Sequence, residues 1–147
     1  MSDAKWSETL SFRLGTLGAL IADQYAAALA VHDLKPKHVG LLGVLDAGLA
    51  TSQLEIAKLM RVAPSLVVSL ADHLESMGAI ERLRDPADRR RQTLTLTDDG
   101  RDLLAECTAK ALALDAELTA DLTSSQQAAL TAALGRLATS YGLPGRD

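Results

Sequence analysis

Three consecutive arginines, Arg89, Arg90 and Arg91, are the strongest candidates for chemistry in this sequence. They follow Asp85-Pro86, which is a turn signal, so they would lie at the tip of a loop. Residues 79–93 hold five basic and three acidic side chains, which gives this segment a charge of +2 within a chain of −4. Guanidinium groups gathered in this way bind phosphates. A solvated surface turn is the alternative.

A second candidate group lies on a single predicted helix. Ser65, Ser69 and His73 recur every four residues and therefore share one helix face, where they could hydrogen-bond base edges or phosphates. Leu66 and Val68 flank this face and could contact thymine methyl groups. Alternatively, these two side chains face another chain or the body of the protein.

The sequence offers no catalytic or metal site. Ser65 and His73 are too far apart along one helix to touch, and there is no glycine-rich phosphate loop. Cys107 is the single cysteine, and its place on an apolar stripe predicts an inert core thiol. His32, His38 and His73 lack the close helical spacing of a metal-ligand pair. We therefore expect no enzyme activity, no metal and no cofactor.

Local signals predict the elements that hold these residues. Ser52 has a glutamate three residues later, which is the spacing of a reciprocal helix cap. Pro64 suits the first position of a second helix, and Gly78 offers a left-handed stop. Residues 80–84 and 92–97 then read as two short strands. Two helices followed by an arginine-tipped hairpin give the order of a winged helix-turn-helix.

Long helices are predicted on both sides of this central region. Apolar stripes at three- and four-residue steps mark one helix from Trp6 to about Val31 and further helices that begin at Pro36, Thr97 and Thr123. The first helix and the last two are too long to be covered by the short central region, so their apolar faces need a partner. A monomeric helical bundle is the alternative.

Four motifs in the chain resemble the MarR-type bacterial transcription regulators. The family pattern Ser-Gln-x-Glu-Leu/Ile-Ala is present at residues 52–57, and Leu-x-Asp-x-Leu-Glu-x-x-Gly at residues 70–78. The wing pattern Asp-x-Arg is present at residues 88–90, and the exit Leu-Thr-x-x-Gly at residues 96–100. Each string alone is weak evidence, but all four occur in order and at the right separations.

This resemblance implies a fold that is mainly α with a small β-hairpin wing, a winged helix-turn-helix with long terminal dimerisation helices. Residues 1–34 would form an N-terminal dimerisation helix, residues 35–97 the DNA-binding region, and residues 98–147 the C-terminal dimerisation helices of one structural domain, intertwined in the dimer. A two-fold homodimer would place two reading heads in successive major grooves of a palindrome.

The resemblance also assigns roles in DNA binding. Arg90 matches the wing arginine that reaches into a narrow, A·T-rich minor groove, and Asp88 would hold it in place. The sequence departs from the family at Val68 and Ser69, where relatives more often carry threonine or arginine. The residues expected to contact DNA are Ser52, Gln53, Pro64, Ser65, Leu66, Val68, Ser69, His73, Arg84, Arg89, Arg90 and Arg91.

Regulation is expected by resemblance alone. Family members commonly respond to small aromatic or phenolic compounds bound between the dimer helices and the reading head. Trp6, Phe12, Tyr25 and His38 are candidates for such a pocket, and for each the alternative is a simple core position. We therefore expect a repressor released from DNA by such a ligand. A winged-helix protein-interaction module, or a small helical enzyme without DNA binding, is the alternative function.

Length and composition indicate the number of domains, the make-up of the core and the solubility of the protein. A chain of 147 residues with 48% hydrophobic side chains is about one domain with an ample core, and aromatics at 3% leave that core to leucine, alanine and valine. No apolar run approaches the roughly 20 residues of a membrane span, and the N-terminus lacks a signal-peptide pattern. We expect a soluble, cytoplasmic protein.

Overall fold

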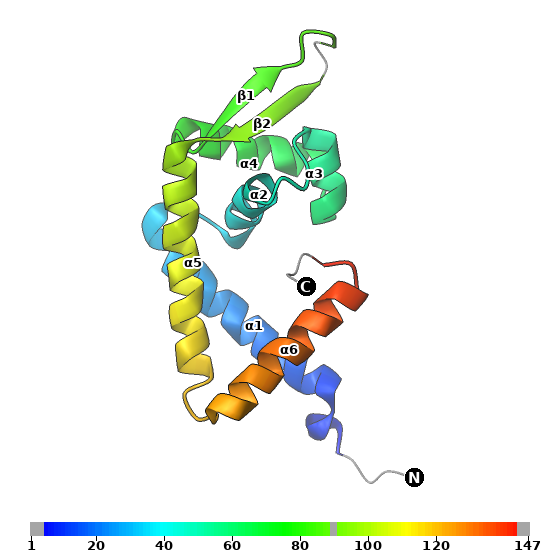
Figure 1. The fold of residues 1–147 in the computed structure, drawn as a ribbon, viewed down its shortest axis with the longest axis vertical. Coiled ribbons are helices and arrows are strands. Elements are labelled where there is room, and N and C mark those ends of the chain that lie inside the picture. Colours follow the sequence, from blue (N-terminus) through cyan, green and yellow to red (C-terminus); the bar gives the residue numbers. More distant parts are fainter. Residues whose placement is uncertain (1–4, 89–90, 144–147) are drawn as a thin grey trace. The chain divides into compact units, whose positions relative to one another are not determined.

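The computed structural model describes residues 5–88 and 91–143, which are mainly helical with one antiparallel hairpin (Figure 1). The predicted fold class is thereby confirmed. The helices are α1 (Leu10–Leu29), α2 (Pro36–Asp46), α3 (Gln53–Met60), α4 (Pro64–Ser76), α5 (Asp98–Leu118) and α6 (Ser124–Ser140), and 3-10 turns at Trp6–Glu8 and Ala30–His32 flank α1. The strands are β1 (Ile80–Arg84) and β2 (Gln92–Leu96).

The chain divides into two compact units, residues 1–112 and residues 113–147, so α5 begins in the first unit and ends in the second. In the first unit, α2, α3 and α4 pack together and the hairpin extends beyond them (Figure 1). In the second unit, α6 follows the end of α5 after a short connection. There Gln127 Nε2 donates to the Oγ1 of Thr119 at 2.6 Å, which holds this corner.

Helix ends follow the predicted local signals at several positions. Thr97 Oγ1 accepts the N–H of Gly100 at 3.0 Å, which caps α5. Thr123 and Gln126 form a capping box at the start of α6, with bonds of 3.2 and 3.0 Å. Gly78 has a φ of +75° just after α4, a left-handed conformation that favours glycine.

The start of α3 differs in part from the predicted reciprocal cap. Ser52 Oγ accepts the N–H of Glu55 at 3.2 Å, which is one of the two bonds of that cap. The backbone beside it pairs with the hairpin, because Leu94 N–H donates to Thr51 O at 2.8 Å and Ser52 forms an isolated bridge with Thr93. Ser52 therefore caps α3 and is also tied to β2.

The core of the first unit lies where α2, α3, α4 and the hairpin meet. The predicted inner face of α4 is confirmed, since Val67, Leu70, Ala71 and Leu74 are all buried. Burial of these side chains is the main free-energy term that fixes the orientation of α4. The largest fully buried side chains around them are Leu29, Leu41, Leu42, Ile56, Ile80, Leu94 and Cys107.

Large apolar side chains stay exposed on α1 and α6. On α1, Leu10 is 76% exposed and Leu14 and Leu17 are each 46% exposed. The predicted stripe of α6 is also open to solvent, at Leu130, Leu134 and Leu137 and at Tyr141 just after it. Among the described residues, no side chains cover these two stripes fully.

The apolar character of the first helix exceeds what the sequence led us to expect. Residues 10–32 form a helical stretch with a mean hydropathy of 1.4 in its most apolar window, which is long and apolar enough to cross a membrane by length and composition. The expectation that no apolar stretch approaches this length is therefore wrong. It counted continuous apolar runs, whereas this helix mixes leucine and alanine with uncharged glycine, serine and threonine.

Candidate nucleic-acid interface

The hairpin places the basic segment at its tip. Its strands pair from Ile80 with Leu96 to Arg84 with Gln92, so the connecting turn starts directly after Arg84. The turn is shaped by Asp85, whose Oδ1 accepts the N–H of Ala87 at 2.9 Å and whose own N–H donates to Arg91 O at 3.0 Å. The predicted turn is therefore confirmed.

Two arginines of this tip are among the described residues. Arg84 and Arg91 are exposed, and Arg91 N–H donates to Asp88 O at 2.9 Å. Arg89 and Arg90 lie outside the described residues, so the predicted role of Asp88 in holding Arg90 stays a prediction. The described part of the wing still offers two accessible guanidinium groups to an anionic partner.

The outward face of α4 carries most of the residues predicted to read DNA. Pro64, Ser65, Val68 and Ser69 are exposed. Leu66 is half-buried and packs against the core, so little of it is available to a ligand. The exposed part of the helix therefore consists of short side chains, which would let its backbone approach another surface closely.

A groove brings α3, α4 and β2 together. Its volume is about 450 Å³, and it contains five of the residues predicted to contact DNA. Gln53 Oε1 is buried there without a hydrogen-bond partner among the described residues, so this amide has bonding capacity left for a ligand. The groove is lined by Ser52, Gln53, Leu54, Glu55, Lys58, Pro64, Val68, Arg91 and Gln92.

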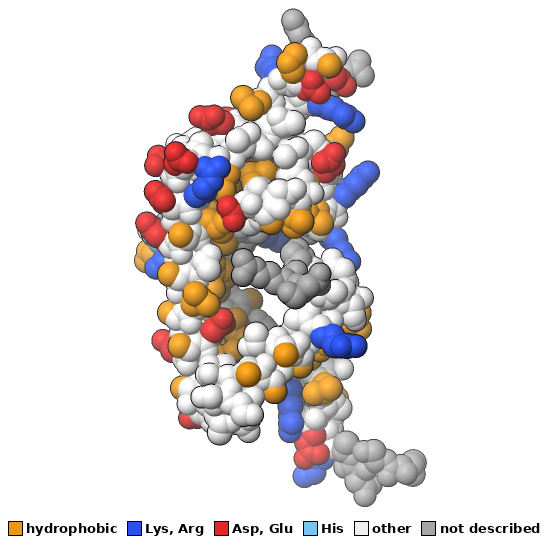
Figure 2. Space-filling model, viewed as in Figure 1, with side chains coloured by type: hydrophobic (Ala, Val, Ile, Leu, Met, Phe, Trp, Pro, Cys, Tyr) orange, Lys and Arg blue, Asp and Glu red, His pale blue; other side chains and the backbone are white. Residues whose placement is uncertain are grey.

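Lys58 is a member of this groove that sequence reasoning missed. It is exposed on α3 and lines the groove together with Arg91 on the wing. Its position six residues after Ser52, in a helix known to begin there, is the signal that could have identified it. Figure 2 shows basic side chains along the hairpin and the α3 edge, acidic ones among them on the hairpin, and a row of acidic ones along α5. The charge asymmetry favours an anionic partner at the groove.

Arg82 on β1 connects the wing to α4. Its guanidinium lies 2.6 Å from Asp72 and 3.2 Å from Glu75, and it also donates to Val68 O at 3.2 Å. Its side chain is only 16% exposed, and its Nε lacks a partner among the described residues. Sequence reasoning placed Arg82 on the hairpin stem but missed these contacts. The facing acidic pair on α4 was the available signal.

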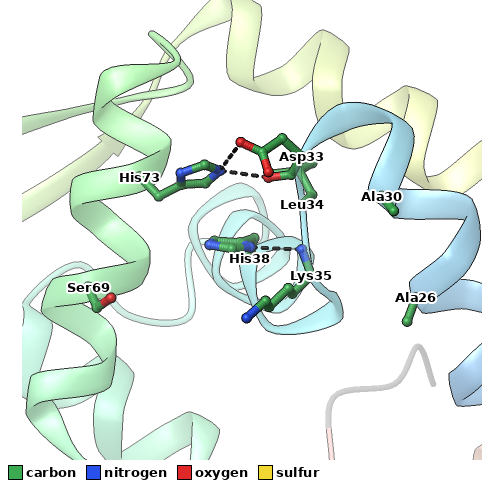
Figure 3. Close-up of a pocket in the computed structure, with 8 residues that line it drawn as sticks. All are labelled: Ala26, Ala30, Asp33, Leu34, Lys35, His38, Ser69 and His73. Atoms are coloured by element: carbon green, nitrogen blue, oxygen red, sulfur yellow. Dashed lines mark hydrogen bonds and ion pairs between the residues drawn. The ribbon is translucent and has the colours of Figure 1, made fainter.

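His73 does not point toward the groove. Its Nε2 lies 2.7 Å from Asp33 O and 3.8 Å from the Asp33 carboxylate, and its ring centroid is 4.7 Å from that of His38 (Figure 3). This placement differs from the prediction because the third turn of α4 faces the connection between α1 and α2. The expected base contact therefore has no geometric support at His73.

A second pocket of about 430 Å³ lies beside this histidine pair (Figure 3). His38 Nδ1 accepts the N–H of Lys35 at 2.8 Å, and burial, together with the nearby charges of His73 and Lys35, lowers the pKa of His38. The pocket is lined by Ala26, Ala30, Asp33, Leu34, Lys35, His38, Ser69 and His73.

The four residues predicted to bind a small ligand fall at different places. His38 lines the second pocket. Tyr25 is half-buried, and its hydroxyl donates to Cys107 O at 3.0 Å, while burial raises the pKa of the phenol. Trp6 and Phe12 contact each other, with ring centroids 4.2 Å apart, near the start of α1. The structure therefore does not gather all four around one cavity.

Metal chemistry has no support within residues 5–88 and 91–143, where no three His, Cys, Asp or Glu side chains come together as metal ligands. Cys107 is fully buried, and burial raises the pKa of its thiol, with a further contribution from Glu106. A buried thiol held in its neutral form is a poor nucleophile. The described surface instead carries the partly basic groove between α3, α4 and β2.

The sequence of this chain is similar to a known protein family. The model described as MarR family matches residues 41–91, from α2 to the wing tip. An HTH-type transcriptional repressor of Mycobacterium tuberculosis is 30% identical over 118 residues, which cover 80% of this chain and 85% of the relative.

Solved structures show the same fold. The transcriptional repressor CouR bound to a 23-mer DNA duplex matches with a TM-score of 0.74 and 30% identity, over 94% of this chain and 98% of that chain. CouR from Rhodococcus jostii RHA1 bound to p-coumaroyl-CoA matches with a TM-score of 0.71 and 25% identity, over 93% and 96% of the two chains. Because fold, sequence and the order of motifs agree, this chain belongs to the MarR family of transcriptional regulators.

Proposed function

We propose that this regulator is a repressor that binds duplex DNA through the groove between α3, α4 and β2. The observation that carries the proposal is this groove, in which Val68 on the outward face of α4 lies together with the basic side chains of Lys58 and Arg91. In such an arrangement cations neutralise phosphates and fix the register, whereas α4 contacts base edges in the major groove. The structure of CouR bound to a 23-mer DNA duplex supports DNA as the partner in this proposal.

We assign the exposed residues of the interface specific partners. The N-terminus of α3, at Ser52 and Gln53, is a site for a phosphate, because free backbone N–H groups and the helix dipole favour an anion. Ser65 and Ser69 are exposed on α4 outside the groove lining and donate to base edges or phosphates, and Ser69 also lines the second pocket. Arg84 and Arg91, with Arg89 and Arg90 beyond the described residues, bind phosphates or enter the minor groove. His73 is omitted, since Asp33 and His38 surround it.

The working unit in this proposal is a homodimer. The exposed leucines of α1 and α6 would be covered by a second copy, which gives residues 1–34 and 98–147 the role of dimerisation helices. A two-fold dimer presents two reading heads, and a palindromic operator with half-sites about 34 Å apart matches that symmetry. Coverage of α1 by a partner also accounts for its apolar character in a cytoplasmic protein.

The pocket beside His38 and His73 is our proposed site for a small aromatic or phenolic effector. It is lined by α1, the α1–α2 connection, the start of α2 and α4, so a ligand there contacts both a proposed dimerisation helix and the recognition helix. To release DNA, the ligand must bind one arrangement of these helices better than the other. The CouR structure with p-coumaroyl-CoA shows that one MarR-type protein holds an aromatic ligand.

Fluorescence anisotropy with the DNA upstream of its own gene tests the proposal. We expect tight binding that weakens steeply between low and moderate salt, because phosphate neutralisation releases counterions. Phenolic compounds added to the complex should then restore free DNA. The Arg91→Ala variant should bind less tightly with a shallower salt dependence. Salt-insensitive or absent binding would favour a protein-interaction module or a small helical enzyme instead.

A further inference from the structure

The recognition helix has no side chain that can read guanine in the usual way. Arg and Lys read guanine by donating to its O6 and N7 atoms, but residues 64–76 contain neither. His73, the one remaining side chain with cationic potential, is turned to Asp33 O at 2.7 Å. The α4 face therefore lacks the donors that select G·C base pairs.

The acidic side chains of α4 are also withdrawn from base reading. Asp72 and Glu75 could accept from cytosine, but both are paired with Arg82 on the wing, at 2.6 and 3.2 Å. The exposed polar residues Ser65 and Ser69 are hydroxyls, which bond to several bases and discriminate weakly. Hydrogen bonds from α4 therefore select few of the bases in the bound DNA.

Val68 supplies a different kind of contact. Its side chain is 40% exposed and lines the groove, where Leu54 on α3 is also 64% exposed. The backbone of Val68 is held in place, because its carbonyl accepts a hydrogen bond from Arg82 at 3.2 Å. Lys58 and Arg91 line the same groove and would bind the flanking phosphates. An apolar surface of fixed position is thereby presented to the major groove.

The major-groove edge of DNA offers one apolar group, the C5 methyl of thymine. We propose that Val68 recognises this methyl group, so that an A·T pair at that position of each half-site is selected by apolar contact. The inference rests on the proposed DNA-binding function and names the chemistry of its base recognition. Leu66 has no such role, because it packs against the core.

A uracil scan tests the DNA side of the inference. A duplex bound by the protein is first isolated from a random pool, and each thymine is then replaced by uracil, which removes only the methyl group. We expect one position per half-site at which binding weakens about fourfold, the value of one methyl group withdrawn from water, and about fifteenfold when both half-sites are changed. A G·C pair with 5-methylcytosine at that position should bind better than an unmethylated G·C pair.

Variants of Val68 test the protein side. Val68→Ser removes both methyl groups of the side chain, so the uracil penalty at the identified position should disappear, whereas Val68→Thr keeps one methyl group and should keep part of it. Val31→Ser makes the same change at an exposed valine in the 3-10 turn after α1 and should leave the penalty intact. Because Val68 is on the surface, circular dichroism should show folded protein in every case.

Each result of these experiments decides the inference. A uracil penalty that is lost in Val68→Ser supports it. A duplex that tolerates uracil everywhere, or a penalty that persists unchanged in Val68→Ser, overturns it while leaving the DNA-binding function intact. If no duplex is enriched from the pool, the proposed function fails and the inference fails with it.

Discussion

His38 and His73 come from different helices, yet their rings meet beside the α1–α2 connection. The charged groups around them are Asp33 and Lys35 on that connection, together with each other's rings. His38 Nδ1 accepts a backbone N–H, and that bond requires a nitrogen without a proton. A second proton on His38 would therefore break this bond.

Stability should consequently depend on pH through His38. Its pKa is lowered by burial first and by the charge of His73 next, so the unfolded chain binds a proton more readily than the folded one. The contribution to stability is present above the unfolded value of about 6.5 and is lost as pH falls through the folded pKa. Urea unfolding from pH 7 to pH 5 should show wild type losing more stability than His38→Asn, whose Oδ1 can accept the same N–H.

His32→Asn serves as the control for this titration. His32 lies 3.6 Å from Glu106 and is not part of the histidine pair. This variant should retain the acid sensitivity that His38→Asn loses. Equal acid sensitivity in wild type and in His38→Asn would show that the histidine pair has no influence on the pH dependence.

A second prediction at the scale of a single residue concerns Gly100. A Cβ at this position would lie 2.0 Å from Ala79 O and 2.9 Å from Leu96 Cδ1, and the first of these is rigid backbone. Gly100→Ala should therefore lower the free energy of unfolding by about 1–3 kcal/mol, as overpacking does. Gly43→Ala is the matched control, since nothing lies within 4 Å of its added Cβ.

Chemical denaturation of both variants checks this prediction. Gly43→Ala should be neutral or stabilising by up to about 1 kcal/mol, because alanine is the better helix former. The prediction is contradicted if Gly100→Ala is as stable as wild type, which would mean that α5 can shift away from Ala79 at no cost.

At the scale of elements, the order of helices and the hairpin followed from signals only a few residues long. Caps, the proline at the start of α4, the glycine after it and the alternating strand each depend on neighbours in the sequence. Contacts between elements were not predictable in this way. The Thr51–Leu94 bond, the Arg82 contacts and the direction of His73 all depend on how separate segments approach one another.

The candidate site, too, could be predicted only where it depends on local sequence. The composition of the α4 face and the basic tip could be predicted, because they follow from residue type and helical spacing. The membership of the groove could not, since Lys58 and Leu54 join it only through the packing of α3 against α4. Leu66 was assigned to the outward face by spacing, but it lies at the border of that face and packs inward.

A third prediction concerns Arg82, which connects the wing to the recognition helix. Arg82→Met removes both ion pairs and the bond to Val68 O, and it leaves two carboxylates on α4 facing the DNA. We expect a loss of about 1–2 kcal/mol in unfolding free energy and weaker DNA binding. Arg101→Met removes an exposed pair with Asp98 and should change stability by less than about 0.5 kcal/mol.

Thermal unfolding and DNA titration of these two variants separate the possible results. If Arg82→Met matches Arg101→Met in both measurements, the wing and α4 are positioned by packing alone, and the ion pairs have no role in holding them.

At the scale of the whole molecule, the exposed apolar stripes are the surfaces that we propose a second chain covers. Leu17 lies on the α1 stripe, and a charge there would have to be buried in the proposed dimer. We expect Leu17→Glu to sediment as a monomer at micromolar concentration, where wild type sediments as a dimer. Leu49→Glu changes an exposed leucine between α2 and α3 and should remain dimeric. A wild-type monomer would refute the dimer directly.

In the proposed complex, two copies of this chain place their grooves and wings on one face of a DNA duplex. Hydroxyl-radical footprinting of the DNA upstream of its own gene measures this arrangement. We expect two protected half-sites on one face, with centres about 10 base pairs or a multiple of that apart, and loss of both in Leu17→Glu. A single protected segment that persists in Leu17→Glu, or no protection at all, would contradict it.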